Sequence, residues 1–172
     1  MIPLTQNEIL DILDCSMQEI TNRMARIYPC KQDSSPSGDV CTVFTTFEGG
    51  YHADLTLYMD TALLTRLTQT VTQSETVSPK DIEDFTKEYF NVICGHIVAR
   101  LFQTAHISSR FCIPRFYPGL HPPENADNTG SFYCVLSYVS GSNERAQLIH
   151  QLPPKKPNKG VSNYGEKDHD RG

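Results

Sequence analysis

Two strand-like runs separated by a pair of glycines constrain the fold more than any other feature of the chain. The first run, residues 40–48, consists largely of β-branched and aromatic side chains. In the second, residues 51–60, apolar side chains alternate with other residues; the alternating set is Ala53, Leu55, Leu57 and Met59. Gly49 and Gly50 between the runs are typical of a two-residue hairpin turn. We therefore expect the two strands to be antiparallel neighbours.

Helices are predicted on both sides of this hairpin. Thr5 and Glu8 have the spacing of a capping box, and apolar residues then recur every three or four positions. This pattern predicts a helix from about Gln6 to Tyr28. After the hairpin, a short helix is predicted around Leu63, Leu64 and Leu67.

The clearest helix start in the chain is at Ser78. Its hydroxyl can cap a helix, Pro79 suits the first helical position, and Asp81 lies near the positive end of the helix dipole. The helix that begins here is expected to run to about Ala105.

Strands are predicted to close the domain, at residues 108–117, 131–140 and 145–152. The predicted helices and strands do not alternate as in a parallel α/β fold. The fold class is therefore α+β, with an antiparallel or mixed sheet of about five to six strands covered by long helices. We expect one domain over residues 1–152 and a polar, flexible tail over residues 153–172, where aliphatic side chains nearly vanish.

Composition excludes several classes of function. The net charge of -5 argues against nucleic acid as a partner, because phosphate backbones select for basic surfaces. No stretch approaches the roughly 20 apolar residues of a membrane span, and Met1 to Leu10 lacks the order of a signal peptide. We therefore expect a cytoplasmic location and no membrane span. The six cysteines form no C-x-x-C pair, which favours buried, reduced thiols, and the six histidines show no metal-ligand spacing.

One exposed stripe is predicted on the long helix. At about 100° per residue, four residues fall opposite its apolar side: Asp84, Glu88, Asn91 and Gly95. Glu88 and Asn91 are then neighbours about 5 to 6 Å apart. A glycine inside a helix costs about 1 kcal/mol relative to alanine. Gly95 therefore needs a reason, and close approach of another backbone is the usual one.

The strand after this helix is expected to return towards the stripe. From Asn91 to Ala105 the helix climbs about 21 Å, and a strand from Ser108 to Pro114 returns about 20 Å. Pro114 should therefore lie near the level of Asn91.

These residues resemble a known signature. Asp84, Glu88, Asn91 and Pro114 reproduce the motif [Asp or Ser]-x3-Glu-x2-Asn-x22-Pro of the CheC, CheX and FliY phosphatases of bacterial chemotaxis. The order of predicted helices and strands is similar to that of the single-site CheX branch. The resemblance implies hydrolysis of the aspartyl phosphate on a CheY-like receiver. Mg²⁺ is then held by the receiver, and this chain needs no cofactor of its own.

The resemblance also implies a role for each residue. Asn91 orients the attacking water, and Glu88 docks the receiver's active-site lysine. Asp84 and Gly95 support the contact surface, and Pro114 shapes the adjacent backbone. It further implies a homodimer joined through a sheet edge. A sheet that ends in the strand near Ala146–Gln151 would offer such an edge, although the sequence does not identify which edge is used.

Other interpretations remain open from the sequence. The same helix face fits a non-catalytic module that binds response regulators or a flagellar or chemotaxis partner. The cysteine count alone suggests a thiol sensor. Glu19 and Asn22 repeat part of the motif in the first helix, but Cys15 and Thr45 stand at its other two positions. We interpret this repeat as chance and predict one site.

Overall fold

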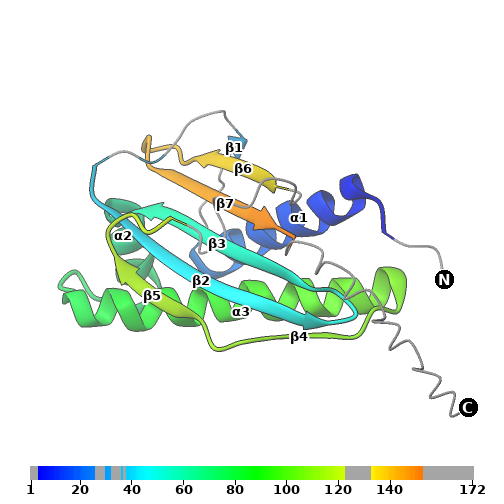
Figure 1. The fold of residues 1–172 in the computed structure, drawn as a ribbon. Coiled ribbons are helices and arrows are strands. Elements are labelled where there is room, and N and C mark those ends of the chain that lie inside the picture. Colours follow the sequence, from blue (N-terminus) through cyan, green and yellow to red (C-terminus); the bar gives the residue numbers. More distant parts are fainter. Residues whose placement is uncertain (1–3, 26–29, 32–35, 37, 123–132, 153–172) are drawn as a thin grey trace, which may run out of the picture.

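The computed structural model describes residues 4–25, 30–31, 36, 38–122 and 133–152. Within them, three helices cover one face of an antiparallel sheet (Figure 1). The predicted α+β class is therefore confirmed. The predicted tail and the predicted end of the first helix at Tyr28 lie outside the described residues.

The sheet has the strand order β1-β6-β7-β3-β2-β4, and β5 also pairs with β2. Every pairing is antiparallel, and β4 and β5 lie one after the other along β2, so the described sheet is six strands wide. The strands are β1 (Cys30–Lys31), β2 (Val40–Gly49), β3 (Ala53–Asp60), β4 (Ser109–Phe111), β5 (Arg115–Pro118), β6 (Tyr133–Val139) and β7 (Arg145–Gln151).

The helices are α1 (Gln6–Ala25), α2 (Thr61–Thr72) and α3 (Pro79–Ala105), close to the predicted segments. The predicted capping box is present, because the Thr5 backbone N–H donates to a Glu8 carboxylate oxygen at 2.7 Å and the Glu8 N–H donates to the Thr5 hydroxyl at 3.3 Å. Alternate residues of the hairpin strands pack against the helices in one core; they include Val43, Phe47, Leu55, Leu57 and Met59. The alternation read from the sequence therefore marks the helix-covered face.

The predicted hairpin pairing is confirmed, but its turn is longer than expected. The register runs from Val40 opposite Asp60 to Phe47 opposite Ala53, which leaves residues 48–52 as the connection. Gly49 has a φ of 103°, and the Gly50 N–H donates to the Ser108 carbonyl at 2.9 Å. A Cβ on either glycine would lie 3.0 to 3.1 Å from that carbonyl oxygen. The glycines thus permit close approach of the chain at Ser108 rather than forming a two-residue turn.

The strand predicted over residues 108–117 is interrupted. Phe47 pairs with Phe111 and Phe44 pairs with Arg115, so two residues of β2 face three residues of the returning chain, 112–114. This extra residue is a β-bulge. Pro114 has no N–H to donate to a ladder, which explains why the pairing breaks at this point.

The edge predicted near Ala146–Gln151 is wrong. These residues belong to β7, which pairs with β3 on one side and with β6 on the other. After the tight turn at residues 140–144, β7 runs back between β6 and β3 of the hairpin. Sequence patterns do not carry strand order, so the strand last in sequence was mistaken for the last in space.

Candidate functional site

Helix α3 is a rigid support whose start is fixed by its own sequence. The Ser78 hydroxyl accepts from the Asp81 N–H at 3.1 Å, and Asp81 accepts from the Ser78 N–H at 2.9 Å, with Pro79 in the first turn. The helix ends where His106 adopts a left-handed conformation, with φ 54°. The result is a helix of 27 residues.

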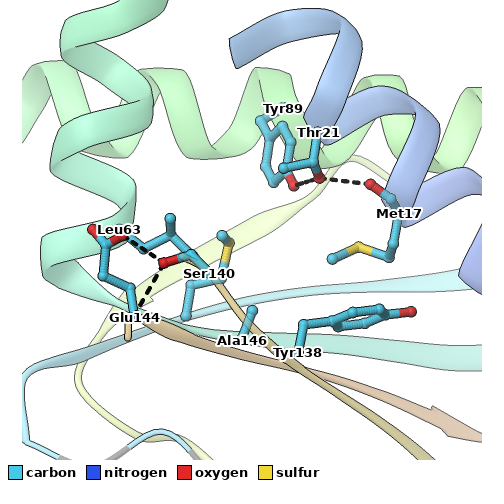
Figure 2. A pocket seen from close by; sticks show the side chains of 9 residues that line it. Met17, Thr21, Leu63, Tyr89, Tyr138, Ser140, Glu144 and Ala146 are labelled. Carbon is cyan, nitrogen blue, oxygen red and sulfur yellow. Dashed lines mark hydrogen bonds between the residues drawn. The ribbon is translucent and has the colours of Figure 1, made fainter. Parts of the chain in front are cut away.

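Buried residues fix how α3 is rotated about its axis. Tyr89 is fully buried, and its hydroxyl is hydrogen-bonded to that of Thr21 in α1 (Figure 2). Thr21 in turn donates to the Met17 carbonyl at 2.6 Å. Burial raises the pKa of Tyr89 to about 12, so the phenol stays neutral at physiological pH. With Tyr89 turned inward, its neighbour Glu88 points outward.

The predicted stripe is exposed along its whole length; it consists of Asp84, Glu88, Asn91 and Gly95. Lys80 donates to Asp84 at 2.8 Å, and this hydrogen bond together with the carboxylate charge raises the pKa of Lys80. In the part of the chain that the structure describes, the side chains of Glu88 and Asn91 make no hydrogen bond or ion pair. The structure thus exposes a carboxylate and an amide one helical turn apart on the same face of α3.

Gly95 lies beside this pair and leaves open space. A Cβ added to it would meet nothing within 4 Å among the described residues. The close backbone approach that we expected at Gly95 therefore does not come from the described part of this chain.

Pro114 is buried beside α3, in the bulge between β4 and β5. The Cys112 N–H donates to the Thr46 carbonyl at 3.0 Å, and the Thr45 hydroxyl donates to the Cys112 carbonyl at 2.6 Å. These bonds hold the bulge to β2 while β4 and β5 run back along α3 (Figure 1). Pro114 is therefore buried and is not itself accessible to a partner.

The other side of α3 carries a cluster of polar residues packed against α1. Glu19 accepts from Arg100 at 3.0 Å and lies 3.0 Å from Nε2 of His96. The hydrogen bond from Cys15, together with the nearby Arg100 and His96, lowers the pKa of Glu19. As the helical spacing predicts, His96 and Arg100 thus point away from the exposed stripe.

This cluster distinguishes the repeated motif fragment, Glu19 and Asn22, from the candidate site at Glu88 and Asn91. Glu19 is held by residues of its own chain, and Asn22 is only partly exposed. Among the described residues, the side chains of Glu88 and Asn91 have no such partners.

Two large apolar residues, Phe102 on α3 and Ile113 beside Pro114, are exposed although no sequence pattern marked them. The stripe continues from Gly95 through Ala99, also exposed, to Phe102, whose side chain is 56% exposed. Ile113, next to Pro114, is 88% exposed. Extending the helical spacing by three further turns from Asn91 would have found Phe102, whereas the exposure of Ile113 depends on the bulge.

The hollow drawn in Figure 2 is not a substrate site. It lies between α1, α2, α3 and the sheet, and its lining includes Met17, Leu63, Tyr89, Tyr138 and Ala146. Its volume is about 10 Å³, which is at the lower limit for one water molecule. A receiver or a metabolite cannot enter it.

The described residues contain neither a cluster of metal ligands nor a helix suited to span a membrane. No three potential metal ligands among His, Cys, Asp and Glu gather there. Among the same residues, no helix combines the length and the apolar character that crossing a membrane requires.

The described cysteines are free thiols, but they are not all buried. Cys41 and Cys94 are buried, Cys15 and Cys134 partly so, and Cys112 is exposed. Burial raises the pKa of Cys94 and of Cys134, and burial and the bond to Glu19 raise that of Cys15. Raised pKa values disfavour the reactive thiolate. The prediction of buried thiols was thus wrong for Cys112, which the bulge leaves in solvent.

Comparison with known proteins identifies a family whose model matches the part of the chain that carries the stripe. The family described as chemotaxis phosphatase CheX matches residues 41–132, which include the whole stripe and Pro114. No curated protein matches the chain in sequence.

Three solved structures illustrate the shared fold. CheX from Desulfovibrio desulfuricans has a TM-score of 0.71 at 16% identity, covering 85% of this chain and 99% of that one. CheX from Borrelia burgdorferi, in a complex with CheY, BeF3 and Mg²⁺, has a TM-score of 0.66 at 12% identity and coverages of 84% and 97%. FliY from Thermotoga maritima has a TM-score of 0.63 at 14% identity, with 89% and 93% covered.

Proposed function

Because the chain belongs to the CheX family of chemotaxis phosphatases, we propose that it hydrolyses the aspartyl phosphate of a CheY-like response regulator. The observation that carries this proposal is the exposure of Glu88 and Asn91 together, on one rigid helix and without partners among the described residues. The Borrelia relative supports the choice of partner, since its structure is a complex with CheY.

The chemistry suits an amide. An acyl phosphate is already activated, so the catalyst chiefly has to place a water molecule in line with phosphorus. The water oxygen bonds to phosphorus while the bond from phosphorus to the receiver's carboxylate oxygen breaks, which releases inorganic phosphate. The Asn91 side chain offers a donor and an acceptor, so it orients this water without a charge that repels the phosphoryl oxygens.

Glu88 acts on the receiver rather than on the water. In this proposal its carboxylate pairs with the receiver's active-site lysine and orients the two proteins. Excluding water from such a pair strengthens it. Asp84, one turn before Glu88, supports the same surface and is itself held by Lys80. Mg²⁺ is held by the receiver.

The two remaining predicted site residues, Gly95 and Pro114, act by leaving space and by shaping the backbone. Gly95 leaves room for the receiver's backbone beside Asn91, since no described atom occupies that space. Pro114 keeps the bulge against α3 and so shapes the surface next to the amide.

The test measures phosphate release. Receivers encoded in the same genome are phosphorylated with acetyl phosphate, and the loss of phosphate is followed with and without this protein. Asn91→Ala should return the rate of phosphate release to that of the receiver alone. Glu88→Ala should lower this rate and should also weaken binding to the receiver. Gln103→Ala and Asp11→Ala, at exposed positions on α3 and α1, are the matched controls.

The non-catalytic alternative makes a different prediction. A module that only binds receivers through the same face would lose affinity on Glu88→Ala but leave the phosphate lifetime unchanged. Faster phosphate release from a receiver in the presence of the wild-type protein would exclude the non-catalytic module. If the protein accelerates phosphate release from none of the receivers, the phosphatase proposal is wrong.

A homodimer stays part of the proposal, with its edge reassigned. In the described residues, β1 pairs only with Tyr138 and Val139 of β6, so the rest of β6 is an open edge within a single strand. Light scattering after size exclusion should give about twice the mass of 19.4 kDa. A proline at Val135, in the middle of β6, should shift the mass to that of the monomer.

A further inference from the structure

We propose that Lys87 of α3 binds the phosphoryl group of the receiver and thereby makes this protein prefer the phosphorylated receiver to the unphosphorylated one. The inference rests on the proposed function, which brings an aspartyl phosphate to Asn91. It adds a cation that recognises the phosphate to the carboxylate and the amide already described.

Lys87 lies at the edge of the stripe, one helical turn before Asn91. Four residues along a helix correspond to a rise of about 6 Å and a net rotation of about 40°. Glu88, three residues before Asn91, is rotated by about 60° in the other direction. The Asn91 amide is therefore flanked, one turn towards the start of α3, by an ammonium on one side and a carboxylate on the other.

The direction of helical side chains brings the Lys87 ammonium within reach of the reaction. Side chains lean towards the N-terminus of their helix, so the Asn91 amide lies over the turn that carries Lys87 and Glu88. Cβ atoms one turn apart are separated by about 5 to 6 Å. The flexible four-carbon stem of a lysine spans such a distance. A phosphoryl group that meets a water held by Asn91 is thus within reach of Lys87.

In the structure the Lys87 ammonium is bound to Glu83, with Nζ 2.9 Å from a carboxylate oxygen. The two side chains are 39% and 34% exposed, and ion pairs in contact with water contribute little to stability. A phosphoryl group offers more negative charge and more acceptor oxygens than a carboxylate. It can therefore take the ammonium from Glu83 when a receiver docks.

The charges around Asn91 favour a cation in this place. The two carboxylates of the stripe, on Asp84 and Glu88, repel an approaching phosphate. Within one helical turn of Asn91 in either direction, the sequence of α3 provides one positively charged residue, Lys87. Lys87 therefore offsets this repulsion at the phosphoryl group, while Glu88 attracts the receiver's lysine.

Such a contact depends on the phosphate in a way that the other two do not. The receiver's lysine is present before and after hydrolysis, so Glu88 binds both forms, and Asn91 holds a water. The charge-assisted hydrogen bond from Lys87 to a phosphoryl oxygen disappears once the phosphate has left. Lys87 thus strengthens binding of the substrate and not of the dephosphorylated product.

The test compares the affinity for two forms of one receiver. One form is unphosphorylated, and the other carries BeF3 with Mg²⁺, as in the Borrelia complex, where BeF3 stands in for the phosphoryl group. Lys87→Met removes the charge and keeps an unbranched side chain, and Lys87→Arg keeps the charge. Arg110→Met, which removes an exposed cation beyond the end of α3, is the matched control. Phosphate release is measured at several concentrations of the phosphorylated receiver with the same variants.

The wild-type chain should bind the BeF3 form more tightly than the unphosphorylated form. Lys87→Met should raise Kd for the BeF3 form about tenfold and Kd for the unphosphorylated form less than about twofold. Because the phosphoryl group is charged before and during the reaction, KM should rise by a similar factor with little change in kcat. Lys87→Arg should keep most of the preference, and Arg110→Met all of it.

Two results with Lys87→Met would overturn the role of Lys87: an unchanged preference, or an equal loss of affinity for both forms, which a merely structural pair with Glu83 would give. If phosphate release is still accelerated in either case, the phosphatase proposal stands. Loss of the preference, in a protein whose wild type never accelerates release, would support the phosphate contact and remove the phosphatase. A wild-type chain that binds both forms equally, or neither, would also overturn the inference.

Discussion

The hydroxyl groups of Tyr89 and Thr21 are hydrogen-bonded in the core, between α3 and α1. Tyr89 directly follows Glu88 in sequence, so an interior contact and the candidate site lie on opposite sides of one helical turn. The buried Tyr89 ring, with this hydrogen bond at its tip, therefore fixes the rotation of α3 that leaves Glu88 and Asn91 exposed.

Tyr89→Phe should cost about 1 kcal/mol in the free energy of unfolding. The loss is limited because the Thr21 hydroxyl keeps its bond to the Met17 carbonyl. Apolar packing of the ring also holds the helix, so the rate of phosphate release should not change. Urea denaturation measures the stability, and a double-mutant cycle with Thr21→Val isolates the hydrogen bond. A loss of activity without unfolding would show that the hydroxyl does more than position the helix.

Arg100→Ala should leave the protein with a single site. The ion pair of Arg100 with Glu19 joins side chains that are 38% and 39% exposed, so its loss should cost no more than about 1 kcal/mol. The variant removes one partner of Glu19, which keeps its contacts with His96 and Cys15, and it does not supply the rest of the motif, because Cys15 and Thr45 stand at the other positions. Phosphate release by Asn91→Ala/Arg100→Ala should therefore equal that of the receiver alone. A faster rate would mean that Glu19 and Asn22 form a second site.

Stability should fall as the pH is lowered from about 7 to about 4, because of His150. This side chain is buried in β7, and burial lowers its pKa from 6.5 to about 4, opposed in part by the charge of Asp54. The Tyr51 hydroxyl contacts its ring, and Cys134 faces it in β6. Between these pH values the unfolded chain binds a proton that the folded chain does not, so acid favours unfolding by up to about 3 kcal/mol.

Denaturation curves at several pH values measure this dependence. His150→Gln should flatten the change between pH 6.5 and 5, where carboxylates contribute little, and His52→Gln at an exposed position is the matched control. An unchanged slope in His150→Gln would assign the acid sensitivity to another group.

Local patterns predicted the elements of this fold better than their order. Ser78 and Thr5 cap their helices within one turn, so both starts were visible in the sequence. The connection at Gly49 and Gly50 depends on the chain at Ser108, which is distant in sequence. The interior place of β7 likewise depends on pairing with β3, which no local pattern encodes.

The candidate site was predictable because its residues lie within one helix. Glu88 and Asn91 share a face because of helical periodicity alone, and both are exposed as expected. The capture of Glu19 by Arg100 joins residues 81 positions apart on two helices, and periodicity does not predict such a pairing. The same holds for Ile113, whose exposure follows from a bulge.

Gly95→Ala tests whether a partner uses the space beside Asn91. Alanine favours a helix interior by about 1 kcal/mol over glycine, and its Cβ meets nothing within 4 Å in the described part of the chain, so the variant should be more stable. If the receiver's backbone approaches Gly95, the added methyl group must lower the affinity for the receiver. Gly95→Gln should lower it further, because the longer side chain fills more of the space. Ala99→Gln, one turn along the same face, should weaken binding less, since that position already carries a Cβ. Thermal unfolding and receiver titration together measure both effects. A variant with higher stability and undiminished affinity would mean that glycine at this position serves no contact.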